Sequence, residues 1–127
     1  LCSTLTSVTI PDSVTTISAG AFVSCSNLTN IAIPKSVTTI DHDAFNNCDA
    51  LTSVTIPDYV TTIGACAFYG CDTLTSVTFI NPNAWECEYW DDETNVKAIS
   101  ASDLSNPEIA AQYLKSTYTY YYWRRTE

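Results

Sequence analysis

The chain has 127 residues, with 14 Asp and Glu against 5 Lys and Arg, so its formal net charge is -9 at pH 7. This length fits one domain, and the acidity disfavours nucleic acid and anionic lipid head groups as partners. Hydrophobic residues make up 46% and charged residues 15%, which excludes wholesale disorder, and no apolar run is long enough to cross a bilayer. The chain opens on Leu1 without a methionine, so we expect a fragment of a longer chain whose targeting signal lies elsewhere.

A repeat of 23 residues organises positions 2–79. Its marker is a column of cysteines, Cys2, Cys25, Cys48 and Cys71. The residues between them follow the frame C-x-x-L-x-x-V-x-I-P-x-x-V-T-T-I-x-x-x-A-F-x-x, in three full copies and a partial fourth. Fixed apolar positions and variable polar positions are typical of coils that stack around one core.

Each copy predicts the same order of short elements, illustrated here by the third. Residues 54–56 alternate apolar and polar side chains with period two, which predicts a short parallel strand. Pro57 then ends the strand and turns the chain. Residues 60–63 predict a second extended run. Ala67 and Phe68 are predicted to close the coil as a helical or 3₁₀ corner, with the ring in the interior.

The tail, residues 81–127, is predicted to cap the last coil, because a stack of repeats must hide its terminal apolar layer from water. Trp85, Cys87 and Tyr89 alternate with two glutamates, which predicts a half-buried strand. Residues 91–93 are all acidic and predict a solvated turn.

The rest of the tail predicts a helix and a final strand. Asn106 is a good N-cap and Pro107 suits the first helical position, so we expect a helix over residues 107–115. Residues 118–123 have strong strand propensity and predict a last extended segment, which leaves the Arg-Arg pair that follows outside it.

The repeat frame resembles the bacterial leucine-rich repeats of the BspA-like surface-protein group in its I-P, V-x-x-I and A-F-x-x-C motifs. The resemblance implies a β-rich α/β repeat solenoid: a leucine-rich repeat right-handed superhelix of 23-residue repeats with short parallel strands and a C-terminal α/β cap. Residues 1–80 would form the repeats and residues 81–127 the cap, within one structural domain. The chain departs from the general pattern where Ser13, Ser36 and Tyr59 replace the usual Asn ladder.

The cysteine column predicts buried thiols that act as small hydrophobic groups. Stacked coils place equivalent Cβ atoms about 4.8 Å apart, beyond the roughly 3.8 Å that a disulfide favours. Cys66 and Cys87 lie outside the column and are the only plausible disulfide pair, the alternative being two free thiols.

Catalytic and metal sites are not expected. His42 is the only histidine and lies between Asp41 and Asp43, a set too small for a metal or acid/base site, so we expect a solvated loop. The sequence has no G-x-S-x-G elbow, no glycine-rich phosphate loop, and no calcium-loop order in residues 91–93. We therefore expect no enzyme activity, no cofactor and no metal.

Candidate binding residues lie where the copies differ most. The outward strand positions carry small polar residues without an anchor for a partner. The divergent positions form a possible partner-binding rim: Lys35, Asp41, His42, Asp43, Asp58 and Tyr59. The aromatic tail is expected to seal the last coil, and the alternative is that Tyr121 and Trp123 stack against glycans.

The resemblance implies a non-catalytic extracellular module at the cell surface, which mediates adhesion or recognition of proteins or glycoproteins on host or neighbouring cells. It would be neither membrane-spanning nor nucleic-acid-binding, and we expect it to be a monomeric fragment of a longer chain. Two alternatives stay open: a passive spacer within a larger surface protein, and carbohydrate binding by the aromatic cap.

Overall fold

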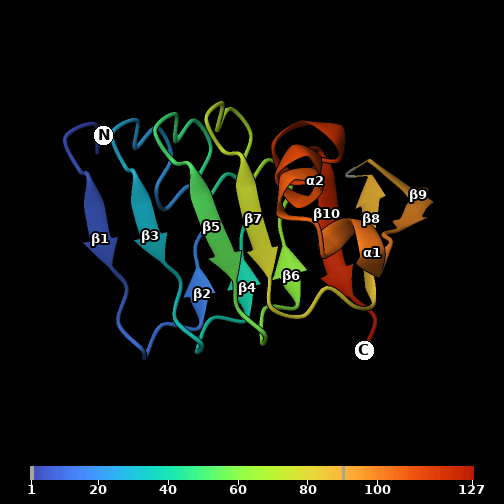
Figure 1. Cartoon of the computed structure of the whole chain (residues 1–127). Helices are drawn as coiled ribbons and strands as arrows, with labels where there is room; N and C mark the ends of the chain where they lie inside the picture. The colour runs from blue at the N-terminus through green and yellow to red at the C-terminus, as the bar shows by residue number, and fades with distance from the viewer. Residues whose placement is uncertain (1, 90) are drawn as a thin grey trace.

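The computed structural model describes residues 2–89 and 91–127. The chain winds through stacked coils with two short strands each, so the strands form two rows (Figure 1). The strands of the first row are β1 (Ser7–Thr9), β3 (Asn30–Ala32), β5 (Ser53–Ile56) and β7 (Ser76–Phe79). The repeat strands of the second row are β2 (Thr16–Ile17), β4 (Thr39–Ile40) and β6 (Thr62–Ile63).

Equivalent residues of successive coils are direct partners across parallel strands. Val8 of β1 pairs with Ile31 of β3, and Val54 of β5 pairs with Val77 of β7. In the second row β4 pairs in parallel with both β2 and β6. Each inward side chain therefore meets its counterpart in the next coil, which confirms the prediction of short parallel strands.

The corner that carries the Ala-Phe pair is a series of turns, so the predicted helical or 3₁₀ corner is wrong. Its backbone donates to the next coil: the N–H of Phe22 lies 2.8 Å from the oxygen of Ala44, and that of Phe45 lies 2.8 Å from the oxygen of Ala67. Residues with a positive φ angle, in the left-handed region of backbone conformation, also flank each corner and interrupt any helical run. They are Gly20, Asp43 and Cys66 on one side and Ser24, Asn47 and Gly70 on the other.

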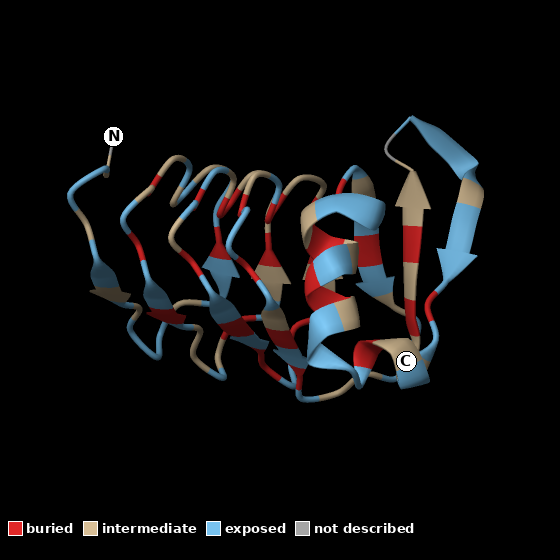
Figure 2. Ribbon diagram, turned by 45° about the horizontal axis from the view of Figure 1, so that its top comes forward, coloured by how far each residue is buried: buried red, intermediate tan, exposed pale blue. Residues whose placement is uncertain are grey.

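The core lies between the two rows of strands, where buried residues gather (Figure 2). Phe22, Phe45 and Phe68 form a stacked column along the coils, as the prediction of an interior ring requires. Phe45 and Phe68 are fully buried, whereas Phe22, in the first coil, is only partly buried.

One rung of the cysteine column is a disulfide, because Cys2 is bonded to Cys25. The prediction of four free thiols is wrong at this rung. The two Cα atoms are 4.9 Å apart, inside the range that disulfides occupy, so the spacing of stacked coils does not forbid a bond. Cys48 and Cys71 are free and buried, and their Sγ atoms lie 3.2 Å and 3.1 Å from the carbonyl oxygens of the preceding coils' phenylalanines.

The two cysteines outside the column do not form a bond. Cys66 and Cys87 are both free thiols, which is the second of the two alternatives expected from the sequence. Burial raises the pKa of the Cys87 thiol to about 12. Burial also raises the pKa of the Cys66 thiol, and the nearby Asp43 carboxylate adds to that shift.

The tail extends the second row of strands and covers the end of the first. Its elements are β8 (Trp85–Tyr89), β9 (Asp92–Ala98), α1 (Ala101–Leu104), α2 (Pro107–Gln112), the π-helical turn η1 (Tyr113–Thr117) and β10 (Tyr121–Arg125). Strand β10 is antiparallel to both β6 and β8 and lies between them, so the sheet order is β2-β4-β6-β10-β8-β9. Helix α2 packs against β7 (Figure 1).

Two predictions for the tail are confirmed. The half-buried strand is β8, with Trp85 and Cys87 buried. The expected helix is α2 continued by η1, and it begins as predicted: the Asn106 side chain accepts hydrogen bonds from the backbone of Glu108 and Ile109, with Pro107 in the first turn.

Two other predictions for the tail are wrong in part. The predicted solvated turn holds for the exposed Asp91, whereas Asp92 and Glu93 belong to the exposed strand β9, in which Asp92 pairs with Tyr89 of β8. The two arginines lie inside β10. Arg124 is held there by ion pairs to Glu86, with Nε 2.7 Å from Oε1, and to Glu88.

Candidate functional site

The expected partner-binding rim is divided between two separate hollows. Lys35, Asp58 and Tyr59 line the first, which we call the Tyr59 hollow. His42 and Asp43 line the second, which we call the Tyr120 hollow. The two hollows share no lining residue, so the rim is not one continuous surface.

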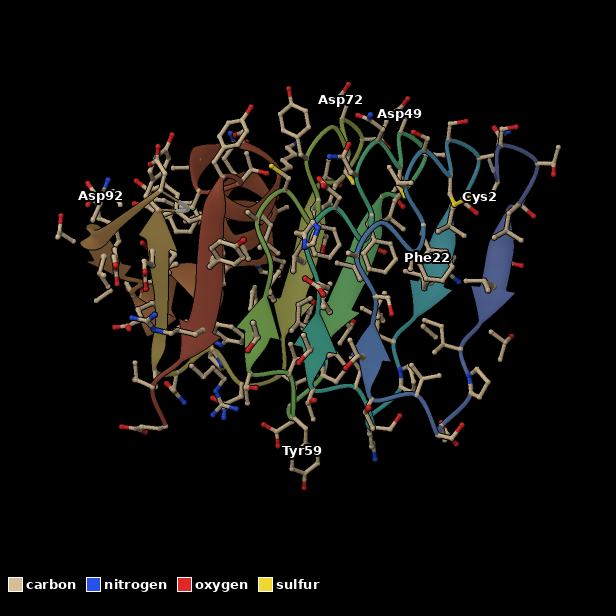
Figure 3. All side chains as sticks on the ribbon, turned by 180° about the vertical axis from the view of Figure 1, so that it is seen from behind. Cys2, Phe22, Asp49, Tyr59, Asp72 and Asp92 are labelled. Atoms are coloured by element: carbon tan, nitrogen blue, oxygen red, sulfur yellow. A yellow bond between two sulfur atoms is a disulfide. The ribbon has the colours of Figure 1, made fainter. Side chains whose placement is uncertain are left out.

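The Tyr59 hollow has a volume of about 540 Å³, and its wall is mainly apolar. Its residues are Ile33, Lys35, Thr55, Pro57, Asp58, Tyr59 and Ile80. Tyr59 is 63% exposed and Ile80 57% exposed. Figure 3 shows Tyr59 projecting from the edge of the solenoid opposite to Asp49 and Asp72. Two exposed anchors therefore flank one concave apolar surface.

Charges of both signs surround the Tyr59 hollow. Lys35 lines it together with Asp58 and also lines a neighbouring hollow together with Asp12. These three residues occupy the same position in successive coils, so the one lysine lies between two aspartates. The backbone oxygen of Asp58 accepts a hydrogen bond from Nη1 of Arg125 at 3.0 Å, which attaches this turn to the cap.

The Tyr120 hollow has a volume of about 360 Å³. It is lined by His42, Asp43, Ala65, Cys66, Tyr120 and Tyr122, which come from the turns after β4 and β6 and from β10 and the residue before it. Three separate segments of the chain therefore converge here, which the sequence alone does not reveal.

Hydrogen bonds fix the acidic turn at the Tyr120 hollow. Nδ1 of His42 lies 2.9 Å from Oδ1 of Asp41, and the His42 backbone N–H donates to the same oxygen at 2.7 Å. The backbone hydrogen bond lowers the pKa of the Asp41 carboxyl below its usual range. Asp43 accepts a hydrogen bond from Nδ2 of Asn46 at 2.8 Å.

Close backbone contact between two successive coils also holds this turn in place. Gly64 lies against the backbone of the preceding coil, and a Cβ at this position would meet the His42 nitrogen at 2.3 Å. The equivalent residues of the first two coils are Ser18 and Asp41. Only glycine fits at this position of the third coil unless the backbone shifts.

The predicted glycan-stacking pair is wrong for Trp123. This side chain is 1% exposed, its ring stacks on Phe79 with centroids 6.1 Å apart, and its Nε1 donates to the Tyr118 oxygen at 3.2 Å. Tyr121 is partly buried and packs edge-on against Tyr118. Both rings belong to the core of the cap, which supports the sealing role expected for the aromatic tail.

The exposed aromatic side chains are the alternate ones. Tyr120 is 46% exposed and Tyr122 45% exposed, because successive residues of a strand face opposite sides and Trp123 faces inward. The sequence predicts that alternate aromatic side chains of this segment face opposite sides. Which of the two sets faces solvent depends on how β10 pairs with β6.

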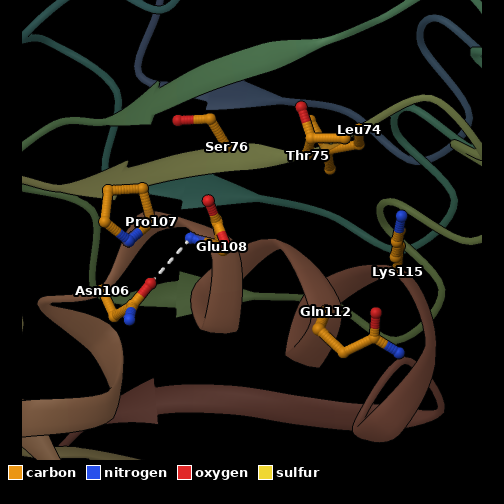
Figure 4. A pocket seen from close by; sticks show the side chains of 8 residues that line it. All are labelled: Leu74, Thr75, Ser76, Asn106, Pro107, Glu108, Gln112 and Lys115. Carbon is orange, nitrogen blue, oxygen red and sulfur yellow. Dashed lines mark hydrogen bonds between the residues drawn. The ribbon is translucent and has the colours of Figure 1, made fainter.

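A third hollow lies between β7 and α2 and has a volume of about 640 Å³ (Figure 4). Asn106 contributes to its wall, but the side chain is engaged in capping α2, with Oδ1 3.1 Å from the Glu108 nitrogen. Lys115 and Glu108 are the charged residues of the lining. The lining of this hollow is mostly polar and contains no aromatic anchor.

Within residues 2–89 and 91–127, no three or more His, Cys, Asp or Glu side chains come together in a group that could hold a metal ion. The helices of the same region are all too short or too polar to cross a membrane.

The comparisons with known proteins agree on one family. The family model of the BspA type leucine rich repeat region matches residues 1–117 with six copies, so the match extends into the cap. A leucine rich cell surface protein from Faecalibacterium prausnitzii is 40% identical with a TM-score of 0.60, over 64% of this chain and 21% of that one. The leucine rich repeat protein TpLRR of T. pallidum is 36% identical with a TM-score of 0.60, over 61% of this chain and 36% of that one.

A leucine-rich repeat protein from Bacteroides ovatus is 43% identical with a TM-score of 0.50, over 51% of this chain and 17% of that one. The chain therefore spans only 17% to 36% of the length of these structures. A search of the curated proteins finds no match.

Proposed function

The chain belongs to the BspA-type leucine-rich repeat family, and from this we propose that it is a non-catalytic, protein-binding module of a larger cell-surface protein. Its partners are proteins or glycoproteins on host or neighbouring cells, and the module acts outside the cell in adhesion or recognition. The relative from F. prausnitzii is described as a cell surface protein, which supports this location. The match to longer chains supports a role as one part of a larger protein.

The observation that carries the proposal is the Tyr59 hollow. Energetically important residues of protein interfaces are typically aromatic or large apolar side chains set in a concave surface and surrounded by polar groups. Tyr59 and Ile80 are such side chains, and Lys35 and Asp58 provide charged groups beside them. The flat strand face between β1 and β7 offers only small side chains, so the Tyr59 hollow is the better contact surface.

The test is binding of the purified chain to immobilised extracellular-matrix glycoproteins, each used both intact and after deglycosylation. We expect saturable binding that survives deglycosylation and weakens about tenfold or more in Tyr59→Ser, the effect of losing one interface anchor. Tyr120→Ser, compared on the deglycosylated proteins, is the matched control, because Tyr120 is also an exposed tyrosine but lies in the other hollow.

The assignment of this surface would be contradicted if the chain bound no protein of the panel, or if Tyr59→Ser left the binding unchanged. A chain that binds nothing would favour a passive spacer, which displays other parts of the parent protein. The spacer needs only a rigid stack, and the continuous core already provides one.

A further inference from the structure

Three exposed tyrosines lie at or beside the Tyr120 hollow, and the ring of Tyr120 is held by the ring of Tyr69. Tyr69, Tyr120 and Tyr122 are 41%, 46% and 45% exposed. The rings of Tyr69 and Tyr120 are in contact, with centroids 5.6 Å apart and planes inclined at 41°. A side-chain hydrogen bond with Tyr69 raises the pKa of Tyr120 above its usual value. The aromatic surface is therefore organised before any ligand arrives, which reduces the entropy lost on binding.

Polar groups with free hydrogen-bonding capacity line the same hollow. One nitrogen of the His42 ring is engaged by Asp41, and among the described residues the other nitrogen has no partner. One oxygen of Asp43 accepts from Asn46, and its second oxygen has no partner in the described part of the chain. The hollow thus combines aromatic faces with a ring nitrogen and a carboxylate oxygen that are able to bind hydroxyl groups.

From this combination we propose that the Tyr120 hollow binds neutral saccharides. The apolar C–H face of a sugar ring packs against the electron-rich face of an aromatic ring, while the hydroxyl groups require hydrogen-bond partners at the edge. Tyr120 and Tyr122 supply the rings, and His42 and Asp43 supply the partners.

Size and charge narrow the ligand class. The volume of about 360 Å³ is at the lower end of the range for small-molecule sites, which fits one or two sugar units. Asp43 lines the hollow, Asp41 contacts the His42 of its wall, and the chain carries a net charge of -9. Sialylated and sulfated sugars would be repelled, so uncharged sugars are the ligands that this site accepts.

This site is independent of the protein-binding surface proposed above. The two hollows have no residue in common, so either can fail its test while the other holds. The main alternative ligand at these tyrosines is a protein partner. A protein and a saccharide differ in what they require of the surface. A protein contact needs apolar area, whereas a sugar needs an aromatic face.

The experiment uses an array of neutral oligosaccharides, each beside its sialylated counterpart, followed by titration of one neutral ligand that binds. The variants are Tyr120→Leu and Tyr122→Leu, which keep apolar bulk but remove the ring. Tyr59→Ser is the control for loss of an exposed tyrosine elsewhere. Circular dichroism of each variant verifies that the fold is retained, which is expected because both rings are on the surface.

We expect neutral sugars to bind more tightly than their sialylated counterparts, and either leucine variant to weaken binding about tenfold or more. The control variant should bind like the wild type. The proposal would be overturned if no sugar of the array bound. It would also be overturned if sialylated sugars bound as tightly as neutral ones, or if both leucine variants bound like the wild type. Capture of a protein through these residues, with leucine tolerated and no sugar bound, would assign the surface to a protein instead.

Discussion

The ring of Phe45 stacks on the ring of Phe68 with centroids 5.2 Å apart and planes 13° apart. Phe22 stacks on the other side of Phe45 at 5.3 Å. The same side chain of three successive coils therefore forms one aromatic column inside the solenoid. Because a coil buries its apolar face only against its neighbours, this column couples the stability of each coil to the next.

Replacing Phe45 with alanine should destabilise the chain strongly. The side chain is fully buried between two rings, so its removal leaves a cavity that neither coil can close. We expect a loss of about 3 to 5 kcal/mol in the free energy of unfolding, measured by urea titration. Phe22→Ala is the matched control and should cost less, because Phe22 is only partly buried. An unfolding curve for Phe45→Ala that coincides with the wild type would show that the column is unimportant.

Breaking the disulfide should destabilise the first two coils. The bond between Cys2 and Cys25 closes a loop across a sequence separation of 23 residues. Loss of this constraint on the unfolded chain costs about 2 to 4 kcal/mol. Cys2→Ser should lower the free energy of unfolding by this amount, and a reducing agent should have the same effect on the wild type. If the reducing agent destabilises Cys2→Ser equally, its effect does not come from this bond.

The repeated part of the fold could be predicted from the sequence because its signals recur in each copy. The V-x-I segments became β1, β3, β5 and β7, since alternation with period two and a following proline define a short strand without reference to the rest of the chain. The signal for the cap helix was also local in the sequence, because Asn106 and Pro107 specify the first turn of that helix. The right-handed sense of the superhelix stays a prediction.

What the sequence could not predict depends on contacts between distant segments. Trp123 and Tyr122 alternate in β10, and only pairing with β6 and β8 decides which of them faces the core. The same holds for Arg124, which the glutamates of β8 draw into the sheet. The Tyr120 hollow combines turns of two coils with β10. Three of its six lining residues could therefore be singled out from the sequence, namely His42, Asp43 and Cys66, but not the tyrosines that complete the hollow.

The stability of the cap should depend on pH through Tyr113. Its hydroxyl donates to Oδ2 of Asp103 at 2.8 Å, and this hydrogen bond raises the pKa of Tyr113 to about 12 from the usual 10.0. Because the pKa of the folded state is the higher one, the stabilisation is complete below pH 10 and is lost as the pH rises from 10 to about 12. The bond joins α1 to the turn after α2, so its loss loosens the cap.

Tyr113→Phe isolates this effect, since it keeps the ring and removes the hydroxyl. The variant should be less stable than the wild type at neutral pH, and the difference between the two should shrink in alkaline solution. Urea titrations across this pH range measure both quantities. A constant difference between the two proteins, or none at neutral pH, would show that the hydrogen bond does not act in this way.

Removal of residues 103–127 should destroy the folded state of the last coils. The deletion takes away α2, which packs against β7, and β10, which lies between β6 and β8. It exposes Phe79, which now packs against Trp123, and it leaves β6 with an unpaired edge. Exposed apolar surface together with a free strand edge promotes aggregation. We therefore expect the truncated chain to elute as aggregates in size-exclusion chromatography and to lose cooperative unfolding.

The matched control removes only residue 127, because Thr126 donates hydrogen bonds to the oxygen of Ala84. The side chains of the cap stay in place, including Trp123 and Arg124, so this shorter chain should remain folded and unfold at nearly the same urea concentration as the wild type. If the longer truncation also gave a soluble chain with cooperative unfolding, the repeats would be stable by themselves. Residues 103–127 would then be an addition to the solenoid and not a part of the cap that its last apolar layer requires.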